Sequence, residues 1–98
     1  MSKTKIVEKI FKIKLVNAQK MNKKYPATFQ IPTKKKLKKI TIGSIVKVCD
    51  EKERFWVIVK EKTSNQLVGK IDNNLISKSI YNRGDLIKFE EKHIYDIY

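Results

Sequence analysis

The chain has 98 residues, and its 23 Lys and Arg against 10 Asp and Glu give a formal net charge of +13. This length indicates a single domain, 1–98, and a hydrophobic content of 41% allows a modest core. No apolar run approaches the roughly 18 residues of a membrane-spanning helix, and Lys12 and Lys14 interrupt the stretch that a secretory signal would need. Because the single Cys49 cannot form an internal disulfide, we expect an intracellular, cytoplasmic protein.

The charge is unevenly distributed along the chain. Residues 1–43 contain 13 Lys and one acid, Glu8, whereas residues 44–98 contain 10 basic and 9 acidic residues. Net charge bears on partners rather than on fold, so the basic part predicts contact with a polyanion. Lys outnumbers Arg by 21 to 2, which suits loose phosphate contact better than base readout. Codon bias in an AT-rich genome is the alternative source of the Lys excess, although it does not explain the scarcity of acids.

The first 24 residues predict an amphipathic helix over residues 4–24. At 100° per residue, apolar side chains share one face and lysines share the opposite face. The apolar face comprises Ile6, Val7, Ile10, Phe11, Ala18 and Met21, and the basic face comprises Lys5, Lys9, Lys12, Lys20 and Lys23. Residues 11–15 also alternate as a strand would, and Pro26 should end the helix.

Residues 25–41 predict a connector that is rich in Pro and Lys. Its first part, YPATFQIP, is expected to be extended, with Phe29 and Ile31 anchoring it to a core. Its second part, TKKKLKK at residues 33–39, fits either a short helical turn or a loop.

Residues 42–98 predict an antiparallel sheet of about five short strands, separated by polar or glycine-containing turns. In the second strand Phe55, Val57 and Val59 share one face, and Trp56 and Ile58 share the other. With the helix packed on a small, strongly bent sheet of the SH3-like barrel type, the fold class is α+β. The predicted strands are 42–49, 54–61, 67–72, 86–90 and 93–98.

An ordered set of motifs runs through this half of the chain: IGSIVKV, ERFWVIV, VGKIDNN and RGDLIKFEEKHIYDIY, with YPATFQIP before them. The pattern resembles the YegJ-like family, small domains of unknown function from bacteria and large DNA viruses. The resemblance covers roughly residues 15–98 and implies a helix ahead of the sheet, but it implies no established activity. Ser44 stands where the family has an acid, and the Lys run at 34–39 is peculiar to this chain. The shared positions are Gly43, Val46, Lys47, Glu53 to Val57, Gly69, Asn73, Gly84, Asp85, Phe89, His93, Ile94 and Asp96.

The sequence offers few groups for catalysis or metal binding. Cys49 lies among apolar residues of a predicted strand, where a buried, inert thiol is expected, and a structural role is expected for His93. Asp50, Glu51 and Glu53 form an acidic turn without the spacing of a calcium loop, so we interpret them as solvated charges. We therefore expect no enzyme, no cofactor and no metal.

Two candidate binding sites remain. The lysines of the predicted helix and a second cluster, Lys34, Lys35, Lys36, Lys38 and Lys39, are expected to contact DNA, RNA or another polyanion without sequence preference. The alternatives are a solvated face that aids solubility, an anionic membrane surface and an acidic protein partner. Arg54 and Trp56 suit stacking on a base or a proline, the alternative being that Trp56 packs under the helix.

The leading hypothesis is therefore a non-catalytic nucleic-acid-binding module. If the AT-rich coding style is viral, a virion or genome-packaging role would fit. The alternative is a protein–protein interaction or structural module that uses the sheet edge and Trp56.

Overall fold

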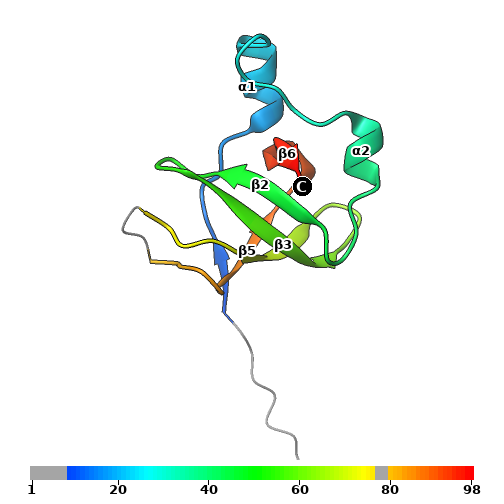
Figure 1. Ribbon diagram of the computed structural model, residues 1–98. Helices are drawn as coiled ribbons and strands as arrows, with labels where there is room; N and C mark the ends of the chain where they lie inside the picture. Colours follow the sequence, from blue (N-terminus) through cyan, green and yellow to red (C-terminus); the bar gives the residue numbers. More distant parts are fainter. Residues whose placement is uncertain (1–8, 77–79) are drawn as a thin grey trace, which may run out of the picture.

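The computed structural model describes residues 9–76 and 80–98, which form a small α+β domain around one six-stranded mixed sheet (Figure 1). Two short helices, α1 (Ala18–Lys24) and α2 (Lys34–Lys38), and a 3-10 helix, η1 (Glu91–His93), accompany the sheet. The order of strands across the sheet is β1-β5-β4-β3-β2-β6. These strands are β1 (Ile10–Lys12), β2 (Ile45–Cys49), β3 (Arg54–Lys62), β4 (Leu67–Ile71), β5 (Leu86–Phe89) and β6 (Asp96–Ile97).

Strands β2 to β5 form an antiparallel meander, and four of the predicted strands are confirmed with shorter or slightly shifted ends. The fifth predicted strand, 93–98, is reduced to the two residues of β6, since its first residue belongs to η1 and residues 94, 95 and 98 are not in a strand. β6 pairs antiparallel with β2. In a flat sheet four interstrand spacings, about 19 Å, would separate β5 from β6. The six residues 90–95 make this connection and include a 3-10 turn, so they could barely span that distance. Four successive antiparallel pairings also make β6 run in the same direction as β5, so the connection would have to return along the strands as well, and the sheet must curl to bring β6 within reach.

The prediction of a purely antiparallel sheet is wrong, because β1 adds a strand that runs parallel to β5. Ile10 lies opposite Leu86, and Phe11 lies opposite Ile87. The sheet is also not closed: over the described residues, β1 and β6 remain at its two edges. The protein is thus a small α+β domain with a curled, mixed sheet.

The predicted helix over residues 4–24 is wrong at residues 10–17, where the chain forms β1 and an extended segment. The reason is packing: the alternating side chains of Phe11, Ile13 and Leu15 all lie against the core. A helix would separate these three side chains by about 200° at each step of two residues. Only α1 remains helical, and its N-cap is Asn17, whose Oδ1 accepts a hydrogen bond from the backbone N–H of Lys20. Residues 4–8 of the predicted helix lie outside the described residues.

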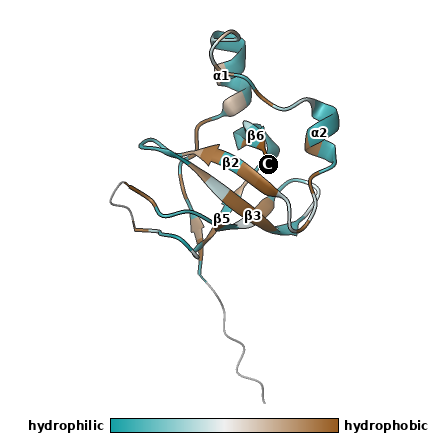
Figure 2. Ribbon diagram, in the orientation of Figure 1, coloured by the Kyte–Doolittle hydropathy of each residue, from teal (hydrophilic) through white to brown (hydrophobic). Residues whose placement is uncertain are grey.

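The hydrophobic core covers one face of the sheet, where the brown strands β2 and β3 are prominent in Figure 2. Leu37 of α2 and the following Ile40 are buried in this core, so the Lys-rich segment is anchored by two apolar side chains. Gly69 permits close packing at the centre, because a Cβ there would clash with Val57 and lie 3.0 Å from a ring carbon of Phe89. No helix within the described residues has the length and apolarity to cross a membrane. The buried side chains of this cluster include Val46, Val48, Phe55, Val57, Val59, Leu67, Ile71, Ile87, Phe89 and Ile94.

Candidate functional site

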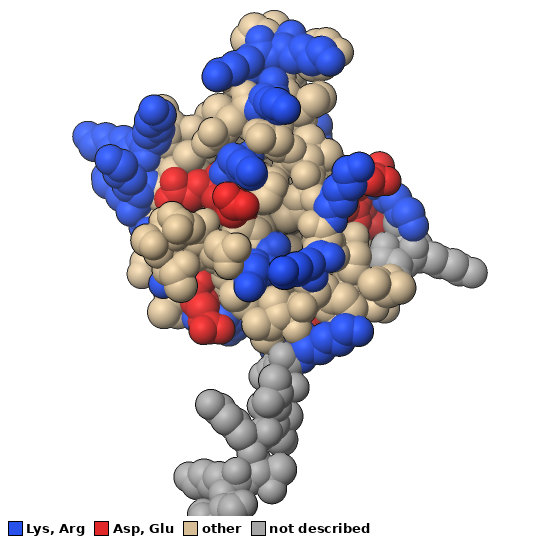
Figure 3. Space-filling model, turned by 180° about the vertical axis from the view of Figure 1, so that it is seen from behind, with Lys and Arg blue, Asp and Glu red and all other residues tan. Residues whose placement is uncertain are grey.

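The predicted lysine stripe does not form on one helix. Lys9 and Lys12 lie at β1, whereas Lys20 and Lys23 lie on α1, and Lys5 is outside the described residues. Seen from behind, basic side chains form separate groups over α1 at the top and α2 at the left (Figure 3). The single stripe is therefore wrong, because β1 replaces the first half of the helix.

The second lysine cluster is brought together on α2. The hydroxyl of Thr33 accepts a hydrogen bond from the backbone N–H of Lys36 and caps this helix, and Leu37 fixes it to the core. All five predicted lysines, at positions 34, 35, 36, 38 and 39, are exposed. The two ion pairs within the described residues, Lys14–Glu51 and Lys92–Glu90, involve none of them. This segment therefore presents concentrated charge that no carboxylate neutralises within 4.0 Å in the described part of the chain.

A groove of about 380 Å³ lies beside this helix, between the connector 27–32 and the outer face of β2, β3 and β6. Its lining includes three cations from different elements: Lys36 of α2, Lys47 of β2 and Arg54 of β3. Asp96 of β6 is the carboxylate in the lining, and its Oδ1 accepts a hydrogen bond from the backbone N–H of Ile97. Cations therefore predominate around a cavity whose volume is in the range of about 300–1,000 Å³ typical of ligand sites.

Two aromatic rings hold Arg54 in the groove. Its guanidinium carbon lies 5.6 Å from the centroid of the Phe29 ring and 5.0 Å from that of Tyr95. The two rings also contact one another, with centroids 5.2 Å apart. Such cation–π contacts restrict the long side chain of Arg without neutralising its charge. Phe29 thus packs against Arg54 and Tyr95 at the groove, and neither it nor Ile31 joins the core cluster to which the connector was expected to be anchored.

Next to Arg54, the buried Tyr95 lies beside the partly buried Cys49. Burial raises the pKa of the Cys49 thiol and that of the Tyr95 hydroxyl, and the nearby charge of Arg54 opposes both shifts. Both groups are therefore neutral near pH 7, but Cys49 is only partly buried, not fully buried as expected. Among the buried side-chain oxygens and nitrogens of the described residues, the Tyr95 hydroxyl alone has no hydrogen-bond partner.

Trp56 lies on the outer face of the sheet, next to the groove. It is opposite Lys47 in the β2–β3 register, and the Nζ of Lys47 lies 4.9 Å from the centroid of its ring. Tyr98 packs edge-on against the same ring, with centroids 6.0 Å apart. The half-buried indole is thus packed by Lys47 and Tyr98, rather than by the helix expected to cover it, and Lys47 links it to the groove.

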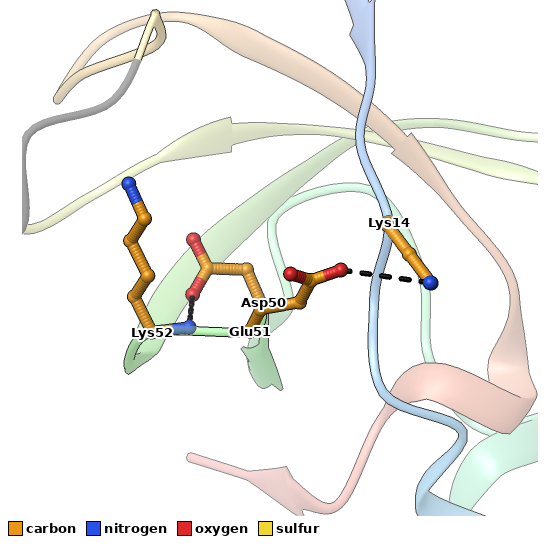
Figure 4. A network of polar contacts seen from close by, with 4 residues as sticks. All are labelled: Lys14, Asp50, Glu51 and Lys52. Carbon is orange, nitrogen blue, oxygen red and sulfur yellow. Dashed lines mark hydrogen bonds and ion pairs between the residues drawn. The ribbon is translucent and has the colours of Figure 1, made fainter.

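The acidic turn after β2 has a structural role. Asp50 is only 4% exposed, so its interpretation as a solvated charge is wrong. Its Oδ1 accepts hydrogen bonds from the backbone N–H groups of Lys52 and Glu53, both at 2.7 Å, and its Oδ2 accepts one from the Tyr81 hydroxyl at 2.5 Å. Burial acts to raise the pKa of Asp50, but these hydrogen bonds outweigh it and lower the pKa. Beside it, the exposed Glu51 pairs with Lys14 (Figure 4).

His93 also has a structural role, as expected. Its Nδ1 accepts a hydrogen bond from the backbone N–H of Glu90 at 3.0 Å and closes the turn of η1. Burial lowers the pKa of His93, Lys92 lowers it further and Glu90 opposes the shift. No group of three or more His, Cys, Asp or Glu side chains suited to a metal ion occurs in residues 9–76 and 80–98.

The sequence pointed to Arg54, Trp56 and the lysines of 34–39, with Tyr95 as an extension of the surface around Trp56, but it did not assign Lys47, Phe29 and Asp96 to this site. The signal for Lys47 was its alternation with buried Val46 and Val48, which places it on the face that Trp56 shares. Comparison with protein-family models, curated proteins and solved structures finds no match to this chain. The resemblance to the YegJ-like family therefore stays a prediction.

Proposed function

We propose that this protein is a non-catalytic module that binds the backbone of nucleic acid through α2 and the groove beside it. The observation that carries the proposal is the cluster of five exposed lysines, four on α2 and Lys39 at its C-cap, which Leu37 anchors to the core and of which Lys36 also lines the groove. We also propose that the fold is an SH3-like variant. The meander β2–β5, the 3-10 turn and the return of β6 to β2 support this assignment, with β1 as an additional edge strand.

Phosphate binding by this surface would be dominated by counterion release. Each phosphate that a lysine neutralises contributes about 0.7 to the slope of log affinity against log salt for a single strand, and about 0.9 for a duplex. Three α2 lysines that all contact phosphate would thus contribute about 2 to the slope for a single strand. Contacts of this kind carry no sequence information, so affinity should depend weakly on base sequence.

The test compares two variants with the same change of charge. One carries Lys34→Gln, Lys35→Gln and Lys38→Gln on α2, and the other carries Gln at the three lysines of α1, namely Lys20, Lys23 and Lys24. Gln and Lys have similar helix propensities, so both helices should persist. Binding of a fluorescent oligonucleotide is measured by anisotropy over a salt series.

We expect the α2 variant to lose affinity and about 2 in salt slope, with a much smaller effect of the α1 variant. Equal losses in the two variants would mean that binding follows net charge and not this site. Absence of salt-dependent binding by the unmodified protein would refute the proposed function.

Protein–protein interaction is the second candidate function, and the exposed aromatic end of the chain favours it. Tyr98 is 90% exposed and contacts Trp56, next to the two-residue edge strand β6. A Trp56→Ala variant that keeps its nucleic-acid affinity but loses a protein partner would support this function over the first.

A further inference from the structure

We infer that the groove between the connector 27–32 and the sheet is a binding site for one nucleotide unit of a single strand, with Arg54 as its phosphate contact. The inference rests on the proposed function and deepens it. It gives the protein a preference for single strands that the lysines of α2 alone would not provide.

In the described part of the chain, Arg54 is held by aromatic rings and not by a carboxylate. The rings of Phe29 and Tyr95 both lie against its guanidinium, at 5.6 and 5.0 Å, and no carboxylate of the described residues lies within 4.0 Å of it. A guanidinium restrained in this way offers its planar N–H groups to a phosphate in fixed geometry, which a lysine cannot do. The chain has 21 Lys and 2 Arg, so Arg54 is one of two basic residues that carry a planar guanidinium instead of an ammonium group.

The lining of the groove combines several cations with one carboxylate. Lys36 and Lys47 accompany Arg54, so the lining suits one or two phosphate groups. The carboxylate of Asp96 would repel a phosphate placed against it, but it can accept hydrogen bonds from a sugar hydroxyl or a base amino group. The lining therefore matches a ligand that carries both a phosphate and neutral hydrogen-bond donors.

The groove continues beside α2 into a second hollow. A second hollow of about 300 Å³ adjoins it, since both are lined by Lys36 and Ile97, and its lining continues to Lys39 and Tyr98. A strand leaving Arg54 would thus pass along α2 toward an exposed aromatic ring, which suits the stacking of a neighbouring base. In a duplex the base faces are stacked and their amino groups are largely paired, so single strands should use these contacts better.

The test uses Arg54→Lys, which keeps the charge and replaces the planar guanidinium by an ammonium group. Arg83→Lys is the matched control, because Arg83 is exposed and lies outside the groove. Each protein is titrated into a labelled single strand of about 16 nucleotides, and into the same strand annealed to its complement. The fluorescence of Trp56, the single Trp of the chain, reports on the groove in the same titration because Lys47 contacts its ring.

We expect Arg54→Lys to weaken single-strand binding about ten-fold at unchanged salt slope and to leave duplex binding within about two-fold, while Arg83→Lys changes neither. Phe29→Leu, which removes one restraining ring, should give a smaller loss in the same direction, and its thermal unfolding shows whether the fold is kept. If the α2 variant loses binding but Arg54→Lys does not, the proposed function stands and this inference is wrong. Equal losses on single strand and duplex would also overturn it. If no oligonucleotide binds the unmodified protein, the proposed function fails first.

Discussion

Tyr81→Phe is the sharpest test of the buried Asp50 turn, because it removes one hydroxyl and keeps the ring. The hydroxyl donates to Oδ2 of a carboxylate that is 4% exposed, while the ring packs between Phe11 and Phe55. A hydrogen bond to a charged group contributes about 1.5–3 kcal/mol, and water cannot readily replace it here. We therefore expect the free energy of unfolding to fall by about 2 kcal/mol. For a domain of this size, such a loss corresponds to a decrease in Tm of roughly 8–16 °C.

The measurement is urea denaturation at pH 7, with Tyr25→Phe as the control. Tyr25 is 49% exposed, so the loss of its hydroxyl should change stability by less than about 0.5 kcal/mol. If Tyr81→Phe is no more destabilising than the control, the buried hydrogen bond contributes no net stability and our reasoning is refuted.

The same variant has a defined pH dependence. Hydrogen bonds lower the pKa of folded Asp50 below its ordinary value of 3.8, so its contribution to stability is present above pH 3.8 and is lost as the pH falls through the folded pKa. Without the Tyr81 hydroxyl the pKa of Asp50 in the folded protein should rise, so Tyr81→Phe has less stability to lose in acid than the unmodified protein. The difference between the two proteins should therefore shrink in acid. A difference that stays constant from neutral pH to pH 2 would contradict this account.

Two further predictions concern the sheet and η1. Gly69→Ala should lower the free energy of unfolding by about 3 kcal/mol, because the new methyl group would clash with Val57 and press on Phe89. Urea denaturation measures this loss, and a loss below about 0.5 kcal/mol would contradict the tight packing around Gly69. His93 has a lowered pKa in the folded state, so stability should fall as the pH drops from its ordinary pKa of 6.5 toward the folded pKa. In His93→Gln this fall should be absent between pH 7 and pH 5, and its persistence would assign it to other groups.

Much of the sheet followed from the sequence because its signals are local. Alternation in 54–61 placed Phe55, Val57 and Val59 on the buried face and Trp56 on the other, as in the structure. Leu37 within a run of lysines left a helical turn or a loop open, and the structure has α2 there. The uneven charge was also visible without a fold, since net charge is a property of composition.

Residues 10–17 could not be assigned from their own pattern. Ile10 and Phe11 fit the apolar face of a helix and Ile13 and Leu15 its edges, but Phe11, Ile13 and Leu15 also alternate as a strand would, and the choice depends on a pairing partner. That partner is β5, which lies about 75 residues further along the chain and pairs with β1 through its free edge. The core then takes up every second side chain of residues 11–15. Local periodicity does not contain this information.

By itself, the sequence determined one small domain, a strand-rich second half and a basic first half, because composition and short-range periodicity set these features. Only the tertiary structure decided that the lysines separate into groups on β1, α1 and α2. It also decided that Phe29, Arg54 and Tyr95, from three segments, meet in one groove. The physical reason is that a site of this kind depends on long-range packing: the connector must fold back over β2, β3 and β6 before the two rings can hold the guanidinium.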